Sequence, residues 1–439
     1  MAEETIVPPE AEPTPEPDRA FISMAWIIAV AAGALIFGIT LRTAPVLCPN
    51  DGSRWDTIWS LVEKGTYIID DCPWPTIDMV HRDGHDYSSK PALWPTLMAG
   101  EYWLIKKLTK WTIQDNTEPV CRTILFTWNV IPLVIYIGLV GHLLARCCAS
   151  QWWRGYWLVA AALGTYVTGY CVTLNDHSLG AMSALFAFYC GIQILHFGNR
   201  KWIHFSLAGL FAAWTVCNQL PSAFFGIALF VWLLVREPKR TLMFGLPAAL
   251  LVVGGFMATT YASTGGFVPY YMYKNTELYQ YEGSYWTNPV GIDALAEPKH
   301  IYLFNSLIGH HGFFSLSPIF VFSVIGIGFA LFRSNPQARQ IAWFVLFGVG
   351  ASLVINVWKT NNYGGVCQGF RYLIWPVPLI IIAGSFAARQ YGRAKWVRAI
   401  ALCCLFISVM TMGVCTDNPW SRSWLEDLCM KHDWLWATY

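Results

Sequence analysis

The residues best suited to chemistry are concentrated in one polar stretch, residues 43–120. Much of it reads CPNDGSRWDTIWSLVEKGTYIIDDCPWPTIDMVHRDGHDYSSKPALWP, which is dense in carboxylates, histidines and arginines. Within it, HRDGHD combines imidazole and carboxylate ligands, and such a set would favour zinc or manganese. A divalent metal ion is therefore one candidate cofactor, with four candidate ligands: His81, Asp83, His85 and Asp86. The alternative is a polar loop that binds no metal.

Two further polar groups stand at the edges of apolar segments. Asn175, Asp176 and His177 separate two apolar runs, and Arg371 with Tyr372 opens another. An acid and a histidine at a membrane face are costly to bury without a purpose, which indicates a site-lining role. The alternative for this triplet is that it only caps the following helix.

Apolar segments must position these residues. A helix needs about 20 residues to cross the hydrocarbon core of a membrane. The sequence predicts an all-α polytopic membrane protein with about eleven transmembrane helices, within a range of roughly ten to thirteen. The expected spans are 21–41, 121–145, 155–174, 178–197, 202–217, 219–235, 241–260, 313–332, 339–357, 372–388 and 396–415. The shorter stretch 92–105 contains Glu101 and is expected to be re-entrant or interfacial.

The distribution of lysine and arginine predicts an orientation, because these residues accumulate in short cytoplasmic loops. With the N-terminus in the cytoplasm, all five inner loops are basic, whereas the outer turns 175–177 and 217–219 carry no lysine or arginine. Residues 43–120, 261–312 and 358–371 then lie on the non-cytoplasmic face. We expect a multi-pass protein of a bacterial inner (plasma) membrane.

Composition agrees with this organisation. The chain has 439 residues, of which 55% are hydrophobic and 13% charged, which excludes an ordinary soluble enzyme. The net charge of +2 gives no basic field for nucleic acid. Three regions are expected: a disordered acidic and proline-rich cytoplasmic tail (1–18), a transmembrane domain (19–415) and an outer amphipathic tail (416–439) to which no chemistry is assigned. Cys48 and Cys72 are either a disulfide or free thiols.

The second long outer loop, residues 261–312, contains a cluster of aromatic side chains. Aromatic faces stack on sugar rings and also occupy membrane interfaces, and we favour the interface role. The cluster consists of Tyr270, Tyr271, Tyr273, Tyr279, Tyr281, Tyr285 and Trp286.

The order of these motifs resembles that of the GT-C fold glycosyltransferases, in particular the aminoarabinose transferase and protein O-mannosyltransferase branch. That branch has an acidic-x-x-Arg-Tyr motif and a later Lys-Pro-Pro-Leu motif in its first loop. Here the first span is followed by DGSRW (51–55), then by KGTY (64–67) and YSSKPAL (87–93). Arg122, the triplet 175–177 and the Arg371-Tyr372 pair continue the pattern over residues 20–390.

The resemblance implies an integral membrane glycosyltransferase with short interfacial helices in its first loop. The reaction implied is inverting transfer of a hexose or pentose from a polyprenyl-phosphate carrier to a lipid, glycan or protein hydroxyl on the non-cytoplasmic face. Asp51 would be the catalytic base that deprotonates the acceptor. Cations would stabilise the departing phosphate, and the candidates are Lys90, Arg371 and Arg54. Four further residues would line the site: Asp176, His177, Tyr87 and Tyr372.

Other interpretations remain open. Asp51 in Pro-Asn-Asp-Gly is also a favourable turn residue, and Lys90 before proline is also a solvated interface anchor. The sequence departs from the family at Gly52 and Ser89, where relatives commonly carry acids. The alternative function is a lipid or solute transporter, or a non-catalytic polyprenyl-lipid-binding membrane protein. Transport needs ionisable groups inside the spans, and the predicted span centres hold almost none.

Overall fold

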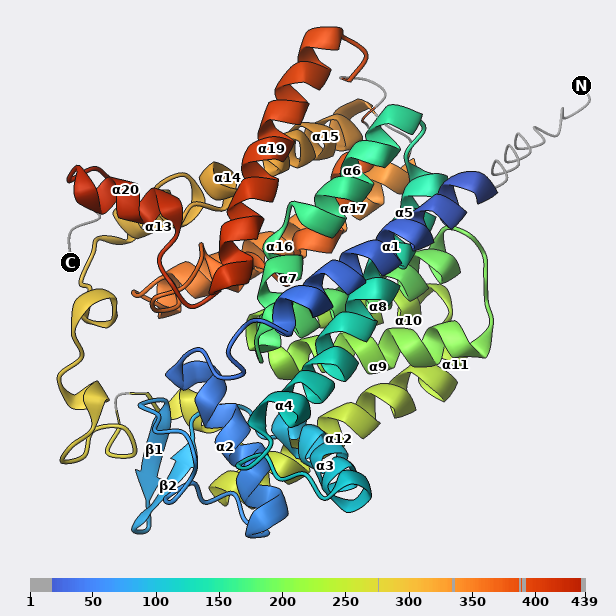
Figure 1. Cartoon of the computed structure of the whole chain (residues 1–439). Helices are drawn as coiled ribbons and strands as arrows, with labels where there is room; N and C mark the ends of the chain where they lie inside the picture. Colours follow the sequence, from blue (N-terminus) through green and yellow to red (C-terminus); the bar gives the residue numbers. More distant parts are fainter. Residues whose placement is uncertain (1–17, 275, 334–335, 387, 389–391, 436–439) are drawn as a thin grey trace, which may run out of the picture.

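The computed structural model describes residues 18–274, 276–333, 336–386, 388 and 392–435. This part of the chain is mainly helical and contains one two-stranded sheet. Figure 1 shows long helices packed side by side, with a smaller group of elements from the first polar stretch at their lower end. The expected cytoplasmic tail lies outside the described residues except for Asp18, whose side chain caps the first helix by accepting from the Phe21 amide.

Six helical segments of the described chain are long and apolar enough to cross a membrane. All six coincide with predicted spans, so the prediction of a multi-pass membrane protein is confirmed at this level. They are Arg19–Thr40 (α1), Thr117–Cys147 (α4, Thr117–Leu125; the π-helical turn η1, Phe126–Val130; α5, Ile131–Cys147), Asp176–Leu195 (α8), Pro238–Thr264 (α11, Pro238–Arg240; η4, Thr241–Gly245; α12, Leu246–Thr264), Pro336–Lys359 (α16) and Lys395–Asp417 (α19).

The other five predicted spans fall on shorter or interrupted helices, and the count of eleven stays a prediction. The third is broken where Thr165 takes an extended conformation, and the eighth is broken at Ser317-Pro318, because proline has no backbone N–H to donate. The helices concerned are α6 (Gln151–Leu163) with α7 (Tyr166–Gly169), α9 (Trp202–Asn218), α10 (Ala223–Arg236), α14 (Phe313–Leu316) with α15 (Ile319–Arg333), and α17 (Val377–Ser385).

Helix α8 is the most enclosed of the six long helices. Within its apolar stretch of 18 residues, 83% of the residues are buried inside the protein, compared with 56% or less in the other five helices. Its N-terminus is capped by Asn175, whose side chain accepts from the Ser178 amide at 2.8 Å. The capping role considered for this triplet is therefore confirmed for Asn175. The next two residues, Asp176 and His177, are held where the helices meet the outer segments.

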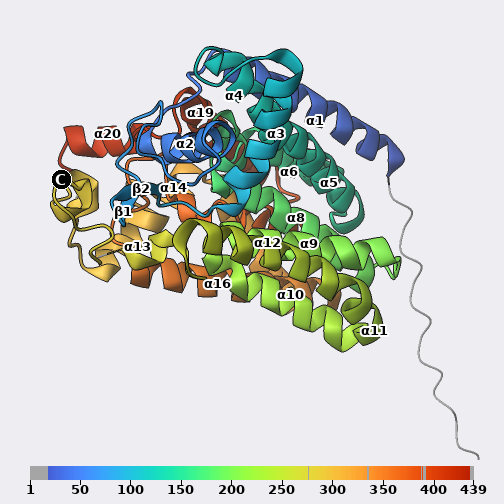
Figure 2. The ribbon, with the colours of Figure 1, turned by 90° about the horizontal axis from the view of Figure 1, so that it is seen from below.

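The first polar stretch folds into helix α2 (Pro49–Glu63), a hairpin of β1 (Met79–Arg82) and β2 (His85–Ser88), and helix α3 (Leu93–Thr109), which covers the segment predicted to be re-entrant or interfacial. The strands are antiparallel, with Met79 opposite Ser88. Asp83 and Gly84 form the turn with positive φ angles of 54° and 82°, as two-residue hairpin turns require. Figure 2, viewed from below, shows these elements lying over the long helices.

The remaining outer segments consist of short helices and turns, and part of the second long loop packs against the hairpin. Val80 of β1 is buried against Tyr270 and Tyr279 from the second long loop. The elements are η5 (Tyr270–Tyr273), η6 (Tyr285–Thr287), η7 (Gly291–Ala294), α13 (Lys299–Leu307), η8 (Arg371–Leu373) and α20 (Trp424–Lys431). Short turns also precede α8 and α10: η2 (Tyr170–Val172) and η3 (Leu220–Ser222). Cys48 and Cys72 are free thiols in this structure.

Candidate functional site: a buried cluster of cations and carboxylates

The start of α2 fixes the position of Asp51. Pro49 occupies the first turn of α2, where the missing N–H is tolerated. The Asp51 carboxylate accepts hydrogen bonds from the backbone N–H groups of Leu47 and Cys48, each at 2.9 Å, and from the Thr173 hydroxyl at 2.8 Å. Asp51 is fully buried, and burial raises its pKa above the usual range. This carboxylate ties α2 to the turn before α8. These contacts favour a structural role for Asp51 over the expected role as catalytic base.

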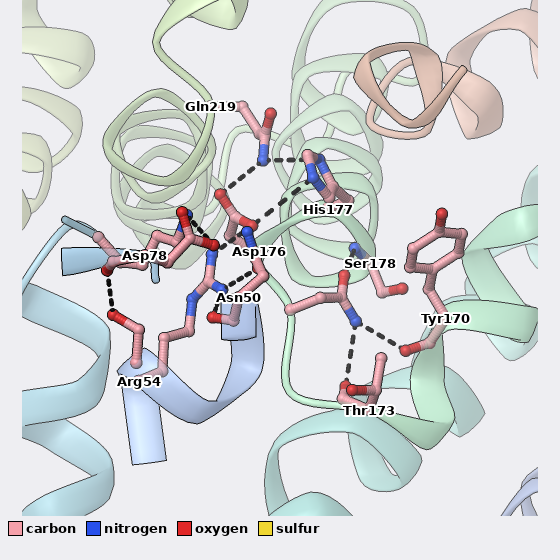
Figure 3. Close-up of polar contacts among 12 residues, drawn as sticks. Asn50, Arg54, Asp78, Tyr170, Thr173, Asp176, His177, Ser178 and Gln219 are labelled. Carbon is pink, nitrogen blue, oxygen red and sulfur yellow. Dashed lines mark hydrogen bonds and ion pairs between the residues drawn. The ribbon is translucent and has the colours of Figure 1, made fainter. Parts of the chain in front are cut away.

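One turn further along α2, Arg54 reaches the N-terminus of α8. Its guanidinium forms an ion pair with Asp176 at 2.8 Å and also donates to the backbone carbonyl of Asn50 at 2.8 Å. The second carboxylate oxygen of Asp176 accepts from the Gln219 amide at 3.0 Å, and the same amide nitrogen lies 3.1 Å from Nδ1 of His177. Figure 3 shows Asp176 between Arg54 and Gln219, with His177 beside them.

The hairpin supplies a second ion pair, because its two ends bring Asp78 and Lys90 together. The Lys90 ammonium lies 3.0 Å from Asp78 Oδ2, and the side chains are only 15% and 17% exposed, respectively. The Ser53 hydroxyl of α2 donates to the Asp78 backbone carbonyl at 2.7 Å, which fixes the hairpin on the helix. Burial opposes ionisation of Asp78, but Lys90, Arg371 and Arg54 together lower its pKa. Asp78 is thus a carboxylate at neutral pH.

Arg371 enters the same region from the loop after α16. Its charge interacts with both Asp78 and Asp176. Gly364, with a φ of 105°, lets the side chain pass, since a Cβ there would lie 2.5 Å from Arg371 Nε. In the described part of the chain, no carboxylate lies within ion-pair distance of Arg371. Its guanidinium carbon instead lies 5.7 Å from the Tyr372 ring centre, and the Tyr372 ring is 6.2 Å from that of His177.

The cluster therefore has more positive than negative charge. Arg54 is paired with Asp176 and Lys90 with Asp78, whereas Arg371 has no carboxylate partner among the described residues. Buried charges are stable when they are paired and hydrogen-bonded. An arginine fork is well matched to a phosphate or carboxylate group. The arrangement can accept one additional anion.

The second long outer loop borders the cluster. The Trp286 indole N–H donates to the carbonyl of Ile77, next to Asp78, at 2.9 Å, and the Lys274 ammonium lies 4.4 Å from the Trp286 ring centre. Burial and the negative charge of Asp78 raise the pKa of Tyr279, whose hydroxyl hydrogen-bonds Ser89. Part of the aromatic cluster that we assigned to the membrane interface thus lies against the cluster of ionisable groups.

Some predicted site residues lie elsewhere. Tyr87 packs against Tyr270, with ring centres 5.7 Å apart, in the aromatic group that also contains Tyr279 and Trp286. Arg122, part of the motif pattern, pairs with Glu118 one turn earlier in α4 at 2.7 Å. Neither of these two side chains takes part in the ion pairs described above.

The HRDGHD candidates do not converge on one point either. His81 pairs with Asp86 at 2.9 Å, whereas His85 pairs with Asp70 at 2.7 Å. Asp83 pairs with Arg82 at the hairpin turn. Across the described ranges, no group of three or more His, Cys, Asp or Glu side chains is arranged to hold a metal ion. The sequence HRDGHD thus forms the outer half of a hairpin whose polar groups pair locally.

Sequence reasoning missed three members of the cluster. Asp78 was one of many carboxylates in the first polar stretch and belonged to no motif. Asn50 directly precedes Asp51, and Gln219 lies in a turn that was noted only for its shortness. A usable signal for Asp78 was its separation of twelve positions from Lys90 across a Gly-containing hairpin turn.

No protein-family model matches this sequence, and no curated protein matches it. Among solved structures, the fold is similar to that of the archaeal oligosaccharyltransferase AglB from Archaeoglobus fulgidus, which was determined in complex with an inhibitory peptide and a dolichol-phosphate. The two chains share 11% sequence identity, and the TM-score is 0.48. The match covers 90% of this chain and 56% of AglB, so this chain spans about half the length of that protein.

Proposed function

We propose that this protein is a membrane glycosyltransferase of the GT-C type. It would transfer a sugar from a polyprenyl-phosphate carrier to a hydroxyl group on the non-cytoplasmic face. The observation that carries the proposal is the convergence of Arg54, Lys90 and Arg371 on two carboxylates, Asp78 and Asp176, where outer segments meet apolar helices. The order of motifs that resembles this class supports it independently.

The proposed chemistry gives the two carboxylates different roles. Asp78 Oδ1 has no hydrogen-bond partner among the described residues, so it can accept the proton of the acceptor hydroxyl. The acceptor oxygen then forms a bond to the anomeric carbon of the sugar, and the bond from that carbon to the phosphate oxygen breaks with inversion. Asp176 has both oxygens occupied by Arg54 and Gln219, so it orients these groups.

The leaving phosphate gains negative charge as the glycosidic bond breaks. Preorganised cations in a site shielded from water stabilise such charge strongly. Lys90 and Arg371 are the proposed phosphate ligands, with Arg54 behind them. Burial, together with Arg54 and Arg371, lowers the pKa of Lys90, although Asp78 favours the charged form. A phosphate at this position would add negative charge and favour the protonated ammonium.

An apolar hollow offers a place for the hydrocarbon chain of the carrier. It has a volume of about 300 Å³ and is lined mainly by apolar side chains of α9, α10, η4 and α12. Val216 and Gly226 belong to its lining and flank the turn that carries Gln219. A chain in this hollow would place its phosphate end towards Asp176. This supports a lipid-linked donor over a soluble nucleotide sugar.

Orientation and localisation are part of the proposal. The basic inner loops favour a cytoplasmic N-terminus, and the cluster would then face the periplasm or cell exterior. We propose a bacterial inner membrane location and one transmembrane domain from residue 19 to 415. The acceptor is a lipid, a glycan or a protein.

The decisive experiment compares Asp78→Asn with wild-type protein in detergent. Labelled hexosyl and pentosyl polyprenyl monophosphates serve as donors, and membrane lipid, glycan and protein fractions serve as acceptors. The wild type should transfer label with at least one donor. Loss of the general base should reduce the transfer rate about 100-fold or more, with the thermal midpoint retained.

Asp71→Asn is the matched control, because Asp71 lies in the same outer loop and its side chain is 86% exposed. It should transfer label at the wild-type rate. Undiminished transfer by a folded Asp78→Asn variant would remove Asp78 from the mechanism. Absence of transfer from the whole donor panel by the wild type would contradict the proposed function.

A further inference from the structure

The C-terminal segment packs against the loop that carries Arg371. The backbone N–H of Gln368 donates to the Pro419 carbonyl at 2.8 Å, and its side-chain amide donates to the Ser421 hydroxyl at 2.9 Å and to the Arg422 carbonyl at 2.7 Å. The Ser423 hydroxyl donates to the carbonyl of His310 at 3.2 Å. The sequence indicated no chemistry for this tail, yet these bonds hold it directly against the candidate site.

Trp420 is the residue of this segment that reaches furthest towards the cluster. It is 7% exposed, and its indole N–H donates to the Thr173 hydroxyl at 3.1 Å. That hydroxyl in turn donates to Asp51 at 2.8 Å. The ring face of Trp420 lies 5.1 Å from the guanidinium carbon of Arg371. This distance is within the range of cation–π attraction, which is strongest for tryptophan.

Arg371 is held by neutral groups. Its Nε is buried without a hydrogen-bond partner. Aromatic faces from Tyr372 and Trp420 and the backbone at Gly364 surround the side chain, whereas Arg54 and Lys90 are each neutralised by a carboxylate. Apart from the interaction with the Tyr372 hydroxyl, a guanidinium supported by rings keeps hydrogen-bond donors available for an incoming anion. The two aromatic rings therefore fix the position of the Arg371 guanidinium, which is the cation of the cluster without a carboxylate partner among the described residues.

We propose that Trp420 is a positioning residue that holds Arg371 as the principal ligand of the leaving phosphate. This inference rests on the proposed function for the identity of the phosphate. It gives the three cations different roles: Arg54 orients Asp176, Lys90 is shared between Asp78 and the phosphate, and the Arg371–Trp420 pair forms the main part of the anion subsite. The C-terminal segment is then a structural part of the site.

Three variants test this inference in the full-length protein. Trp420→Phe keeps a ring beneath Arg371 and removes the N–H, and Trp420→Leu removes both. Thr173→Val leaves Trp420 in place and removes the hydroxyl that accepts from its N–H and donates to Asp51. Trp434→Leu is the matched control, because Trp434 lies in the same tail and is 54% exposed. For each variant we would measure the thermal midpoint, the KM and kcat for the labelled sugar donor, and the binding of decaprenyl phosphate itself.

Trp420→Leu should raise the donor KM and the Kd for decaprenyl phosphate about tenfold, with kcat changed less. Trp420→Phe and Thr173→Val should stay within about threefold of the wild type, since the cation–π contact persists. Trp434→Leu should match the wild type. A purely structural role would lower the amount of active protein and leave the KM and the Kd unchanged.

Two results would overturn the inference. The first is a folded Trp420→Leu protein with wild-type affinity for decaprenyl phosphate. The second is a folded Trp420→Phe protein that loses about tenfold in affinity, and this second result remains decisive if Trp420→Leu does not fold. If the wild type binds decaprenyl phosphate but transfers no sugar, the proposed function fails. The role of Trp420 is then tested by the Kd values for decaprenyl phosphate of the wild type and the variants.

Discussion

Replacement of Asp51 by asparagine tests whether this carboxylate is structural or catalytic. The sequence made Asp51 the candidate base, but its oxygens accept from two backbone N–H groups and the Thr173 hydroxyl. One oxygen serves Leu47 and Thr173, and the other serves Cys48. Asparagine keeps one acceptor oxygen and replaces the other by an NH₂ group. That NH₂ group would then face a backbone N–H or hydroxyl donor and could not accept its hydrogen bond. Asp51→Asn should therefore weaken the junction between α2 and the turn before α8.

The size of the effect follows from these contacts. A buried donor that loses its partner costs about 1 to 3 kcal/mol. The loss is partly offset, because burial raises the pKa of Asp51 and so its charge is disfavoured in the folded state. We expect Asp51→Asn to lower the free energy of unfolding by about 2 kcal/mol and Asp51→Ala by about 3 kcal/mol. Folded Asp51→Asn protein should keep transfer activity within about tenfold of the wild type.

Thermal unfolding in detergent, followed by tryptophan fluorescence, measures the stability difference, and the labelled-donor assay measures the transfer rate per folded molecule. Asp71→Asn is again the control, because an exposed ion pair contributes little to stability. Suppose that Asp51→Asn unfolds at the wild-type temperature but loses transfer about 100-fold. That outcome would refute the structural assignment and restore Asp51 as the base.

Two further predictions concern stability and donor binding. Burial raises the pKa of the fully buried Asp56 to about 7, so the folded state holds this proton more tightly than the unfolded state does. The contribution of this proton to the free energy of unfolding is therefore fully present below about pH 4 and falls by about 4 kcal/mol as the pH rises through 7. Asp56→Asn should remove this fall. Equal dependence of the free energy of unfolding on pH in the variant and the wild type would contradict the prediction. Gly364→Ala would place a Cβ 2.5 Å from Arg371 Nε and displace that side chain, so the KM for the donor should rise severalfold. Gly365→Ala is the control, because it introduces similar backbone strain at a φ of 82° but has open space around its Cβ. Equal KM values for the two variants would contradict the displacement of Arg371.

Much of the membrane architecture could be predicted from the sequence. Six predicted spans coincide with helices long enough to cross a bilayer, because a long apolar run has few other stable conformations in lipid. The prediction was less accurate for short segments. The 155–174 run appears continuous by composition, yet an extended Thr165 divides it, and hydrophobicity carries no information about that backbone angle.

The candidate site was predictable in part. Asp176 and His177 were selected because such groups are costly to bury at a membrane face, whereas Arg54, Lys90 and Arg371 were selected from the resemblance as cations for a leaving phosphate. The structure brings these five residues together. Tyr87 was selected as part of the YSSKPAL motif and the HRDGHD residues for their ligand types, but Tyr87 packs against Tyr270 and the HRDGHD side chains pair locally. Residues that share a loop of almost 80 positions need not share a site.

The sequence by itself determined which segments are apolar, where charged residues lie between them and which residue types could carry chemistry. Only the tertiary structure showed which groups each carboxylate contacts. Asp51 and Asp78 are both aspartates of the first polar stretch. In the structure, the Asp51 carboxylate accepts from backbone N–H groups, whereas the Asp78 carboxylate pairs with Lys90. Trp420 lies 49 positions from Arg371 and supports it through a ring face. Such assignments depend on contacts between distant segments, and these contacts form only when the chain folds.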